Sequence, residues 1–395
     1  MKTSRKLLLL LLPFMAACQL EPPMDTLEPM EGGGFVTSLK TELVDFSDIP
    51  KFAFGMDVSD ILFFIDKSIL IQATAISYHT VDPHGNPVTA SGMVYHPLNR
   101  PSKGVIEFMP LAVLNKDGGP SDKFYASEGM PAYLGYTVLV PDLLGFGVSK
   151  DVEYPYLMAE NTGRVAYDLR RAAAEYLWQE FQYKLPSETI LAGYSLGGFA
   201  SIAAQKYYET HHANTVKIKK VYSGGAVYDF PIVLNTLAKT GISHHPSIPY
   251  VMKAYNHYYN LDLDFTKIFI GDLLTNYTSW LDWVFTSDEL REKLPPNIAT
   301  YMHPDFFKPL NEQNAEFKKL HDPLRQNTLI YGWTPKAPIY FTSAYYDEYL
   351  GTDSIKEAVK VFRQAGTSVS IQYVNGGHVD VGMYFILNML FVALK

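Results

Sequence analysis

The sequence predicts an α/β fold with a mostly parallel central sheet, helices on both of its faces, and a helical insertion between two late strands. Strand-like and helix-like segments alternate from Gly104 onward, which requires crossover connections between parallel strands. An aromatic-rich, helix-like stretch from Asp229 to about Lys336 interrupts this alternation, which then resumes. With 395 residues and 47% hydrophobic content, the chain can bury a large core.

The first 17 residues have the anatomy of a signal peptide. A basic start is followed by the apolar run Leu7–Met15 and by small residues before Cys18. The segment Met15–Cys18 resembles the lipobox of bacterial lipoproteins, whose pattern prefers leucine where Met15 stands. An ordinary secretory signal with an incidental cysteine is the alternative interpretation.

This resemblance implies cleavage after residue 17 and lipidation of Cys18. Residues 18–34 are rich in proline, glycine and acidic side chains and are expected to form a lipidated tether. We therefore expect an exported bacterial lipoprotein anchored to a membrane, with the outer membrane as the favoured location and either the periplasm or the cell surface as its exposure. The other apolar runs are too short or too interrupted to span a bilayer.

The segments that follow are assigned by their periodicity and turn signals. Two β-rich segments, Ile69–Tyr78 and Val88–His96, flank the turn Asp82–Pro87 and predict an antiparallel hairpin. Residues 35–68 are expected to wrap over the core, and residues 121–134 to be partly helical. Further strands are expected at residues 104–110, 136–142, 189–194, 220–226, 338–343 and 368–374, and helices around residues 165–177, after Ser195, at 355–362 and from Asp380 onward.

The sequence Gly193-Tyr-Ser195-Leu-Gly197 lies between an apolar strand and a helix rich in small residues. It matches the G-x-S-x-G elbow, which exposes a nucleophilic serine on a sharp strand-to-helix turn. Glycines at the flanking positions remove the collisions that such a turn would cause. Ser195 is therefore the predicted nucleophile.

A serine nucleophile needs a base, and the base needs a group that orients it. In enzymes with this elbow, the chain order is serine, then Asp or Glu, then histidine. His378 lies in the glycine-containing loop after the last strand and is the histidine that follows the strand at 338–343. It is therefore the predicted base, and a structural loop histidine is the alternative.

Asp347 is the predicted acid because it follows the strand at 338–343 by four residues. Asp353 and Asp380 are better explained as helix caps. Glu348 is the nearest competitor, but its side chain should diverge from that of Asp347. The oxyanion hole needs two N–H donors, for which we expect Leu196 and Leu111, with Ala112 as second choice, because Pro110 has no N–H.

Several classes of function are disfavoured. The net charge of −8 and the lack of a basic stripe argue against binding of nucleic acid. The single cysteine excludes an intrachain disulfide and a cysteine-based metal site. The pairs His211-His212 and His244-His245 lack metal-ligand spacing and are expected in solvated loops. No cofactor or metal is expected.

The loop Pro141–Ser149, the segment Tyr154–Leu157 and the elbow with its double glycine resemble α/β-hydrolases, over residues 35–395. Within that superfamily the chain is similar to secretory-lipase-type esterases and related bacterial lipoproteins. The resemblance implies a hydrolase core of residues 35–228 and 337–395, a helical cap at 229–336, and the triad Ser195, Asp347 and His378. Many relatives carry His-Gly before the oxyanion residue, where this chain has Met109-Pro110.

These observations favour a serine carboxylic-ester hydrolase that acts through an acyl-enzyme. Fold alone does not choose among lipases, esterases of plant cell-wall polysaccharides and peptidases. A serine peptidase of the prolyl-oligopeptidase or aminopeptidase type is one alternative, and a non-catalytic ligand-binding lipoprotein is another. The expected partners are a small or polysaccharide-linked ester and, through Cys18, a membrane.

Overall fold

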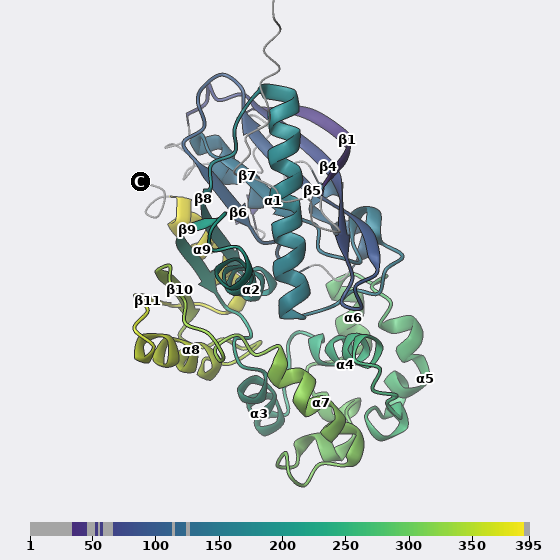
Figure 1. The fold of residues 1–395 in the computed structure, drawn as a ribbon. Helices are drawn as coiled ribbons and strands as arrows, with labels where there is room; N and C mark the ends of the chain where they lie inside the picture. Colours follow the sequence, from purple (N-terminus) through teal and green to yellow (C-terminus); the bar gives the residue numbers. More distant parts are fainter. Residues whose placement is uncertain are drawn as a thin grey trace, which may run out of the picture.

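A computed structural model describes residues 34–45, 52–53, 56–57, 66–112, 115–123 and 127–390. The predicted signal peptide, Cys18 and all of the tether except Gly34 lie outside the described residues. Figure 1 shows a central twisted sheet with helices packed against it. The sheet has nine strands in the order β1-β4-β5-β7-β6-β8-β9-β10-β11, and β2 and β3 form a separate pair.

The strand positions follow the predicted alternation closely. The hairpin predicted around Asp82–Pro87 is confirmed, because β4 and β5 pair antiparallel from Ile71↔Pro97 to Val81↔Pro87. From β7 to β11 in sheet order all neighbours are parallel, whereas β1, β4 and β5 form an antiparallel edge. The strands are β1 Phe35–Val44, β2 Phe52–Ala53, β3 Met56–Asp57, β4 Ile71–Val81, β5 Pro87–Pro97, β6 Val105–Phe108, β7 Thr137–Pro141, β8 Glu188–Tyr194, β9 Lys217–Gly224, β10 Ile339–Ala344 and β11 Val369–Val374.

Two hydrophobic cores lie on the two faces of this sheet. Along β7, Leu139 belongs to one core and its neighbours Val138 and Val140 to the other, as the alternation of side chains in a strand requires. Helices α1 (Ala159–Phe181), α2 (Leu196–His211) and α8 (Asp353–Gln364) pack in the first core. The 3₁₀ segment η5 (Ser127–Leu134) and helix α9 (His378–Asn388) pack in the second. Helices therefore cover both faces, as predicted.

A buried ion pair fastens α1 and α2 to the strand that runs beside the elbow strand. Arg170 Nη1 on α1 lies 2.8 Å from Glu107 Oε1 on β6. The hydroxyl of Tyr208 on α2 donates to the other carboxylate oxygen of Glu107. A buried charge needs such partners, because an unpaired one would be costly to desolvate. Helices α1 and α2 and strand β6 are thus joined by polar contacts as well as by apolar packing.

Helices α3 to α7 lie between β9 and β10, and we call residues 229–336, which contain them, the cap. Figure 1 shows its helices gathered below the sheet. None of the described helices combines the length and apolar composition needed to cross a membrane. The cap helices are α3 Phe230–Thr240, α4 Ser247–Tyr258, α5 Gly271–Trp280, α6 Ser287–Lys293 and α7 Ala315–Gln326.

Candidate active site

Ser195 stands at the turn between β8 and α2, in a backbone conformation that non-glycine residues seldom adopt, with φ 58° and ψ −119°. The glycines around it allow this turn. A Cβ on Gly193 would lie 2.1 Å from the carbonyl oxygen of Gly197, and one on Gly197 would lie 2.4 Å from the carbonyl oxygen of Met109. The strain at Ser195 is therefore held by close backbone packing on both sides.

Replacing Gly193 with alanine should destabilise the fold, because the new methyl group meets backbone that cannot move independently. We expect a loss of about 2–4 kcal/mol in the free energy of unfolding, measured by chemical denaturation. Gly241→Ala is the matched control: Gly241 has φ 66° with nothing within 4 Å of an added Cβ, so only about 1 kcal/mol should be lost. Equal losses at the two positions would contradict this account of the elbow.

The three predicted catalytic side chains lie in one hydrogen-bonded series. His378 Nε2 is 2.9 Å from Ser195 Oγ, and His378 Nδ1 is 2.9 Å from Asp347 Oδ2. His378 is 4% exposed and Asp347 is 8% exposed, so both are largely shielded from water. This geometry allows the imidazole to take a proton from the hydroxyl while the carboxylate holds its orientation.

The carboxylate of Asp347 is fixed by its own loop. Its Oδ1 accepts the backbone N–H groups of Tyr349 and Leu350, each at 3.0 Å, which leaves Oδ2 directed at the imidazole. Of its competitors, Asp353 starts α8 and lies 3.4 Å from Lys356 Nζ, rather than capping the helix with its side chain. Asp380 accepts the N–H of Gly377 and caps α9, as the sequence indicates.

The side chain of Glu348 also contacts His378, but at the backbone N–H of the histidine and not at its imidazole. Its Oε2 accepts the N–H of His378 at 2.8 Å, and the imidazole itself is left to Asp347. The side chains of Glu348 and Asp347 thus take different paths to the same residue. Helix α9 begins at His378, two residues earlier than the sequence indicates, so an acidic group at this helix start is also electrostatically favourable.

The two expected oxyanion donors are placed differently. Leu196 is the first residue of α2 and lines the cavity over Ser195. The N–H of Leu111, in contrast, donates to Glu128 Oε1 at 3.1 Å, which argues against the choice of Leu111. Ala112, the second choice, lines the cavity. No local sequence pattern indicates that Glu128, in η5, would accept the N–H of Leu111.

Sequence reasoning missed two aromatic rings at the site. The ring of Tyr349 stacks on the imidazole of His378, with centroids 4.5 Å apart and planes 9° apart. His245 lies in a loop of the cap, as the sequence predicts, but it is half-buried and lines the same cavity, so the prediction that it is solvated is wrong. Burial above all, and then the nearby charges of His378 and Arg291, lower the pKa of His245 to about 3. His245 is therefore neutral at ordinary pH.

The loop Pro141–Ser149 and the cap aromatics have structural roles in the described chain. Asp142 accepts hydrogen bonds from the N–H of Ser121 and the hydroxyl of Ser91, which fixes the loop to β5. Trp283 packs among Tyr154, Tyr156 and Tyr250. Within the described residues, no group of three or more His, Cys, Asp or Glu side chains is placed to hold a metal ion.

Comparison with known proteins places the chain in a family. The sequence profile of the Alpha/beta hydrolase family matches residues 118–384, an interval that includes Ser195, Asp347 and His378. The chain belongs to the alpha/beta hydrolase family. No curated protein matches this alpha/beta hydrolase in sequence.

Solved structures share the fold of this alpha/beta hydrolase over most of its length. A hydrolase structure from Legionella pneumophila has a TM-score of 0.77 at 22% identity, covering 92% of this chain and 98% of its own. The rice cell wall degrading esterase LipA from Xanthomonas oryzae has a TM-score of 0.71 at 20% identity, with coverages of 93% and 96%. Candida antarctica lipase A in its closed state has a TM-score of 0.60 at 14% identity, with coverages of 91% and 82%. At these identities the likeness establishes the fold alone.

The cavity over Ser195 in this alpha/beta hydrolase is narrow, with a volume of about 30 Å³, and it continues into the cap. It shares Leu157, Val227, Ser247 and Leu350 with a second narrow cavity, which is lined almost entirely by apolar side chains. That second cavity shares Leu234, Met252, Leu320 and Leu324 with a third cavity of about 310 Å³. The three cavities are therefore adjacent to one another, from Ser195 to the cap.

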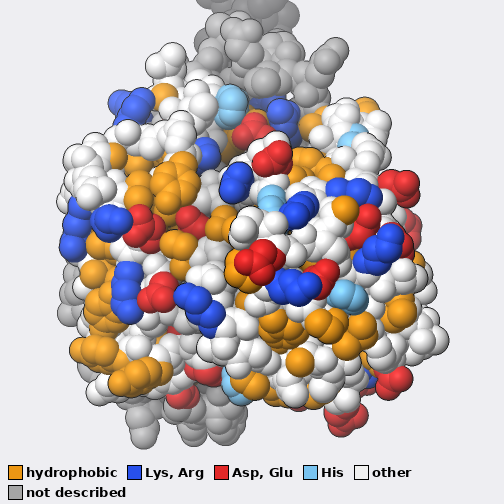
Figure 2. Space-filling model, turned by 90° about the horizontal axis from the view of Figure 1, so that it is seen from below, with side chains coloured by type: hydrophobic (Ala, Val, Ile, Leu, Met, Phe, Trp, Pro, Cys, Tyr) orange, Lys and Arg blue, Asp and Glu red, His pale blue; other side chains and the backbone are white. Residues whose placement is uncertain are grey.

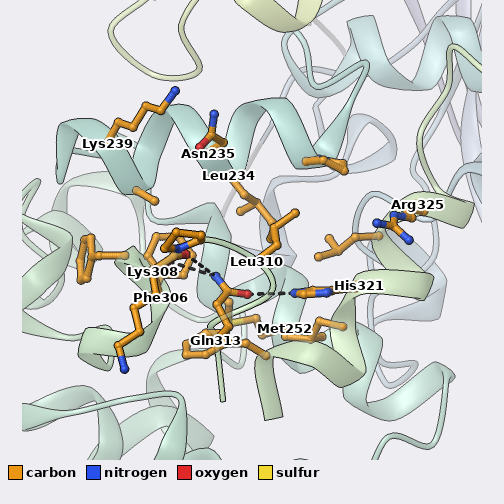
Figure 3. Close-up of a pocket in the computed structure, with 17 residues that line it drawn as sticks. Leu234, Asn235, Lys239, Met252, Phe306, Lys308, Leu310, Gln313, His321 and Arg325 are labelled. Atoms are coloured by element: carbon orange, nitrogen blue, oxygen red, sulfur yellow. Dashed lines mark hydrogen bonds between the residues drawn. The ribbon is translucent and has the colours of Figure 1, made fainter. Parts of the chain in front are cut away.

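Figure 3 shows this third cavity, which we call the cap cavity. Leu234, Met252 and Leu310 lie around its middle. The amide oxygen of Gln313, Oε1, is hydrogen-bonded to His321 Nε2 at 2.9 Å. Figure 2 views the molecule from the cap side, where acidic and basic side chains are intermixed and separated by apolar patches. Apolar side chains form most of the walls of the cap cavity, and the basic side chains of Lys239, Lys308 and Arg325 also line it.

Proposed function

We propose that this alpha/beta hydrolase is a serine carboxylic-ester hydrolase that acts through an acyl-enzyme on Ser195. The observation that carries the proposal is the hydrogen-bonded series from Ser195 Oγ through His378 to Asp347, with 2.9 Å at each step. Ser195 also lies on a strand-to-helix turn whose strained backbone is typical of nucleophilic serines. The named activities of LipA and Candida antarctica lipase A, an esterase and a lipase, agree with ester substrates.

In the proposed reaction, His378 Nε2 takes the hydroxyl proton as Ser195 Oγ bonds to the ester carbonyl carbon. Asp347 holds the tautomer with the proton on Nδ1 and stabilises the imidazolium that forms. The tetrahedral intermediate collapses as the imidazolium protonates the leaving alkoxide, which releases the alcohol and leaves an acyl-serine. Water then attacks the acyl carbon with His378 as base, and the acid product and free Ser195 are formed.

The negative charge on the carbonyl oxygen would be received by the backbone N–H groups of Leu196 and Ala112. Both residues line the cavity over Ser195, and Leu196 stands at the N-terminus of α2, where the helix dipole favours negative charge. Glu128 fixes the preceding peptide N–H, that of Leu111, and so helps to set the direction of the Ala112 amide. Each donor is worth roughly 10²–10³ in kcat in enzymes of this kind.

A fluorophosphonate probe tests the nucleophile directly, because it phosphonylates only an activated serine. Labelling of the wild-type protein and loss of labelling in Ser195→Ala are expected. Ser201→Ala is the control: Ser201 is buried on the same helix, and its hydroxyl donates to the carbonyl of Gly198. An unlabelled wild-type protein would overturn the proposal and would favour a ligand-binding role instead.

A substrate panel tests the reaction class. Nitrophenyl esters should be hydrolysed with a much higher kcat/KM than aminoacyl arylamides, and hydrolysis should depend on Ser195. Strong preference for the amides would mean that the chain is a serine peptidase. The two substrate series carry comparable chromophoric leaving groups, so the comparison reports on the bond that is cleaved.

The series of cavities predicts a preference for apolar acyl groups, with the acyl chain running from Ser195 toward the cap cavity. Leu320 is shared by the two cap-side cavities, so Leu320→Trp should narrow the passage. We expect kcat/KM for a long-chain nitrophenyl ester to fall about tenfold relative to the acetate ester. Val284→Trp is the control, because Val284 is 51% exposed in the cap and lines none of the three cavities. A uniform loss for both esters in Leu320→Trp would contradict this path.

We also propose that the chain is exported and anchored through lipid on Cys18. The proposal rests on the signal-peptide anatomy of residues 1–17 and on the lipobox-like residues before Cys18. Incorporation of labelled palmitate and membrane association are expected for the wild-type chain and should be lost in Cys18→Ser. A secreted, unlipidated wild-type protein would show that the signal is an ordinary secretory one.

A further inference from the structure

The ring of Tyr349 contacts the imidazole of His378 on a face that the triad hydrogen bonds do not reach. Asp347 and Ser195 engage the two ring nitrogens, and both of those contacts lie at the edge of the ring. Tyr349 covers a face of the ring, nearly parallel to it at 4.5 Å between centroids. The ring of Tyr194 is farther away, at 5.2 Å, and tilted by 48°. The close parallel contact therefore comes from Tyr349.

The other end of Tyr349 is held by the cap. Arg291 Nη2, on α6, donates to the hydroxyl of Tyr349 at 2.9 Å. The same guanidinium lies 2.9 Å from Asp288 through Nη1, and a capping box between Thr286 and Glu289 fixes the start of α6. The phenol is thus held between the cap helix and the imidazole.

We propose that Tyr349 is a positioning residue for His378 and that Arg291 couples its position to the cap. The inference rests on the proposed function, because it assigns a role to a residue that acts through the general base. The chain itself brings this about, since Asp347, Glu348 and Tyr349 are consecutive and contact Nδ1, the backbone N–H and the ring face of His378, respectively. One short segment therefore restrains the histidine in three directions.

The physical reason lies in the angular tolerance of proton transfer. An imidazole held only at its nitrogens can still tilt about the line that joins them, and catalytic geometry must be kept within about 10–20°. A stacked phenol restricts that tilt. When His378 accepts the serine proton, the same phenol faces a cation, which aromatic faces attract. Arg291 donates to the hydroxyl of the phenol, so this hydrogen bond does not involve the ring face that stacks on the imidazole.

The test compares three variants by stopped-flow phosphonylation of Ser195 and by hydrolysis of nitrophenyl acetate. Tyr349→Leu removes the stacked ring, and we expect both kcat and the phosphonylation rate to fall about 10- to 100-fold with little change in KM. Tyr349→Phe keeps the ring and should stay within about threefold of the wild type. Tyr346→Leu is the matched control, because Tyr346 lies in the same loop and is 86% exposed.

A spectroscopic readout separates positioning from a general loss of fold. The Nδ1 proton shared with Asp347 should give a low-field proton resonance that persists in Tyr346→Leu and Tyr349→Phe but broadens in Tyr349→Leu. Arg291→Met removes the hydrogen bond to the Tyr349 hydroxyl without changing a residue that lines the cavity over Ser195. It should lower kcat about threefold in the wild-type background and have no further effect in the Tyr349→Phe background.

Several outcomes would overturn the proposal. Wild-type rates and an unchanged resonance in Tyr349→Leu would remove the positioning role. A raised KM with unchanged kcat would make Tyr349 a wall of the substrate cavity instead. Equal effects of Arg291→Met in both backgrounds would remove the coupling to the cap. Failure of the wild-type protein to react with the probe would count against the proposed function, and is thus distinguishable from these results.

Discussion

His378→Gln is expected to lower kcat for ester hydrolysis by about 10⁴- to 10⁶-fold, because the serine hydroxyl then has no base within reach. Glutamine can occupy the space of the imidazole without adding a charge to this buried site. The loss should appear in kcat far more than in KM, since the side chain acts on the proton of Ser195. Steady-state kinetics with nitrophenyl esters, together with thermal unfolding of the variant, check the prediction.

Two controls sharpen this result. His211→Gln, on the surface of α2, should leave kcat unchanged. The double variant Ser195→Ala/His378→Gln should be no slower than either single variant, because members of one catalytic unit are not additive. A double variant that is slower by the product of the two single effects would show that the two residues act independently, and so contradict the triad.

Asp347→Asn is expected to lower kcat by about 10⁴-fold while preserving the fold. The amide oxygen can still accept the N–H groups of Tyr349 and Leu350, so the amide NH₂ would face His378 Nδ1. The imidazole would then accept at Nδ1 and carry its proton on Nε2, which is the wrong tautomer for removing the proton of Ser195. Kinetics across the pH range, with the unfolding temperature as a check on folding, measure the effect.

Glu348→Gln is the matched control for Asp347→Asn. Its oxygen still accepts the N–H of His378, so kcat should change by less than about tenfold. The two substitutions are neighbours and make the same chemical change, so they differ only in which part of His378 the carboxylate contacts. A larger loss in Glu348→Gln than in Asp347→Asn would reassign the acid.

Much of the fold and of the candidate site can be predicted from local sequence patterns. The hairpin around Asp82–Pro87 and the strand-serine-helix pattern at Ser195 depend on turn chemistry and periodicity, which act over a few residues. The choice of Asp347 and His378 depends on chain order, because parallel strands bring their carboxyl ends to one edge of a sheet. These signals place the elements and the three side chains, and they also locate the insertion before β10.

Contacts between the cap and the core could not be read in the same way. The position of His245 depends on how the cap packs over the core, and the stacking of Tyr349 on His378 depends on how two loops of the core meet. The sequence favours Leu111 because Pro110 has no N–H to donate, but the carboxylate of Glu128, in another segment, accepts the N–H of Leu111. Side-chain partners that lie far apart in sequence leave no periodic signal, so local patterns cannot reveal them.

The two-core construction of the sheet has a consequence for inactivation by heat. Ser195 directly precedes α2, which packs in one core, whereas His378 begins α9, an 11-residue helix that packs in the other. Elements of a fold can open separately, each at its own free energy below that of global unfolding. Detachment of α9 alone would withdraw the imidazole from an otherwise intact molecule. Reversible loss of turnover should therefore set in at temperatures where calorimetry still records a folded protein.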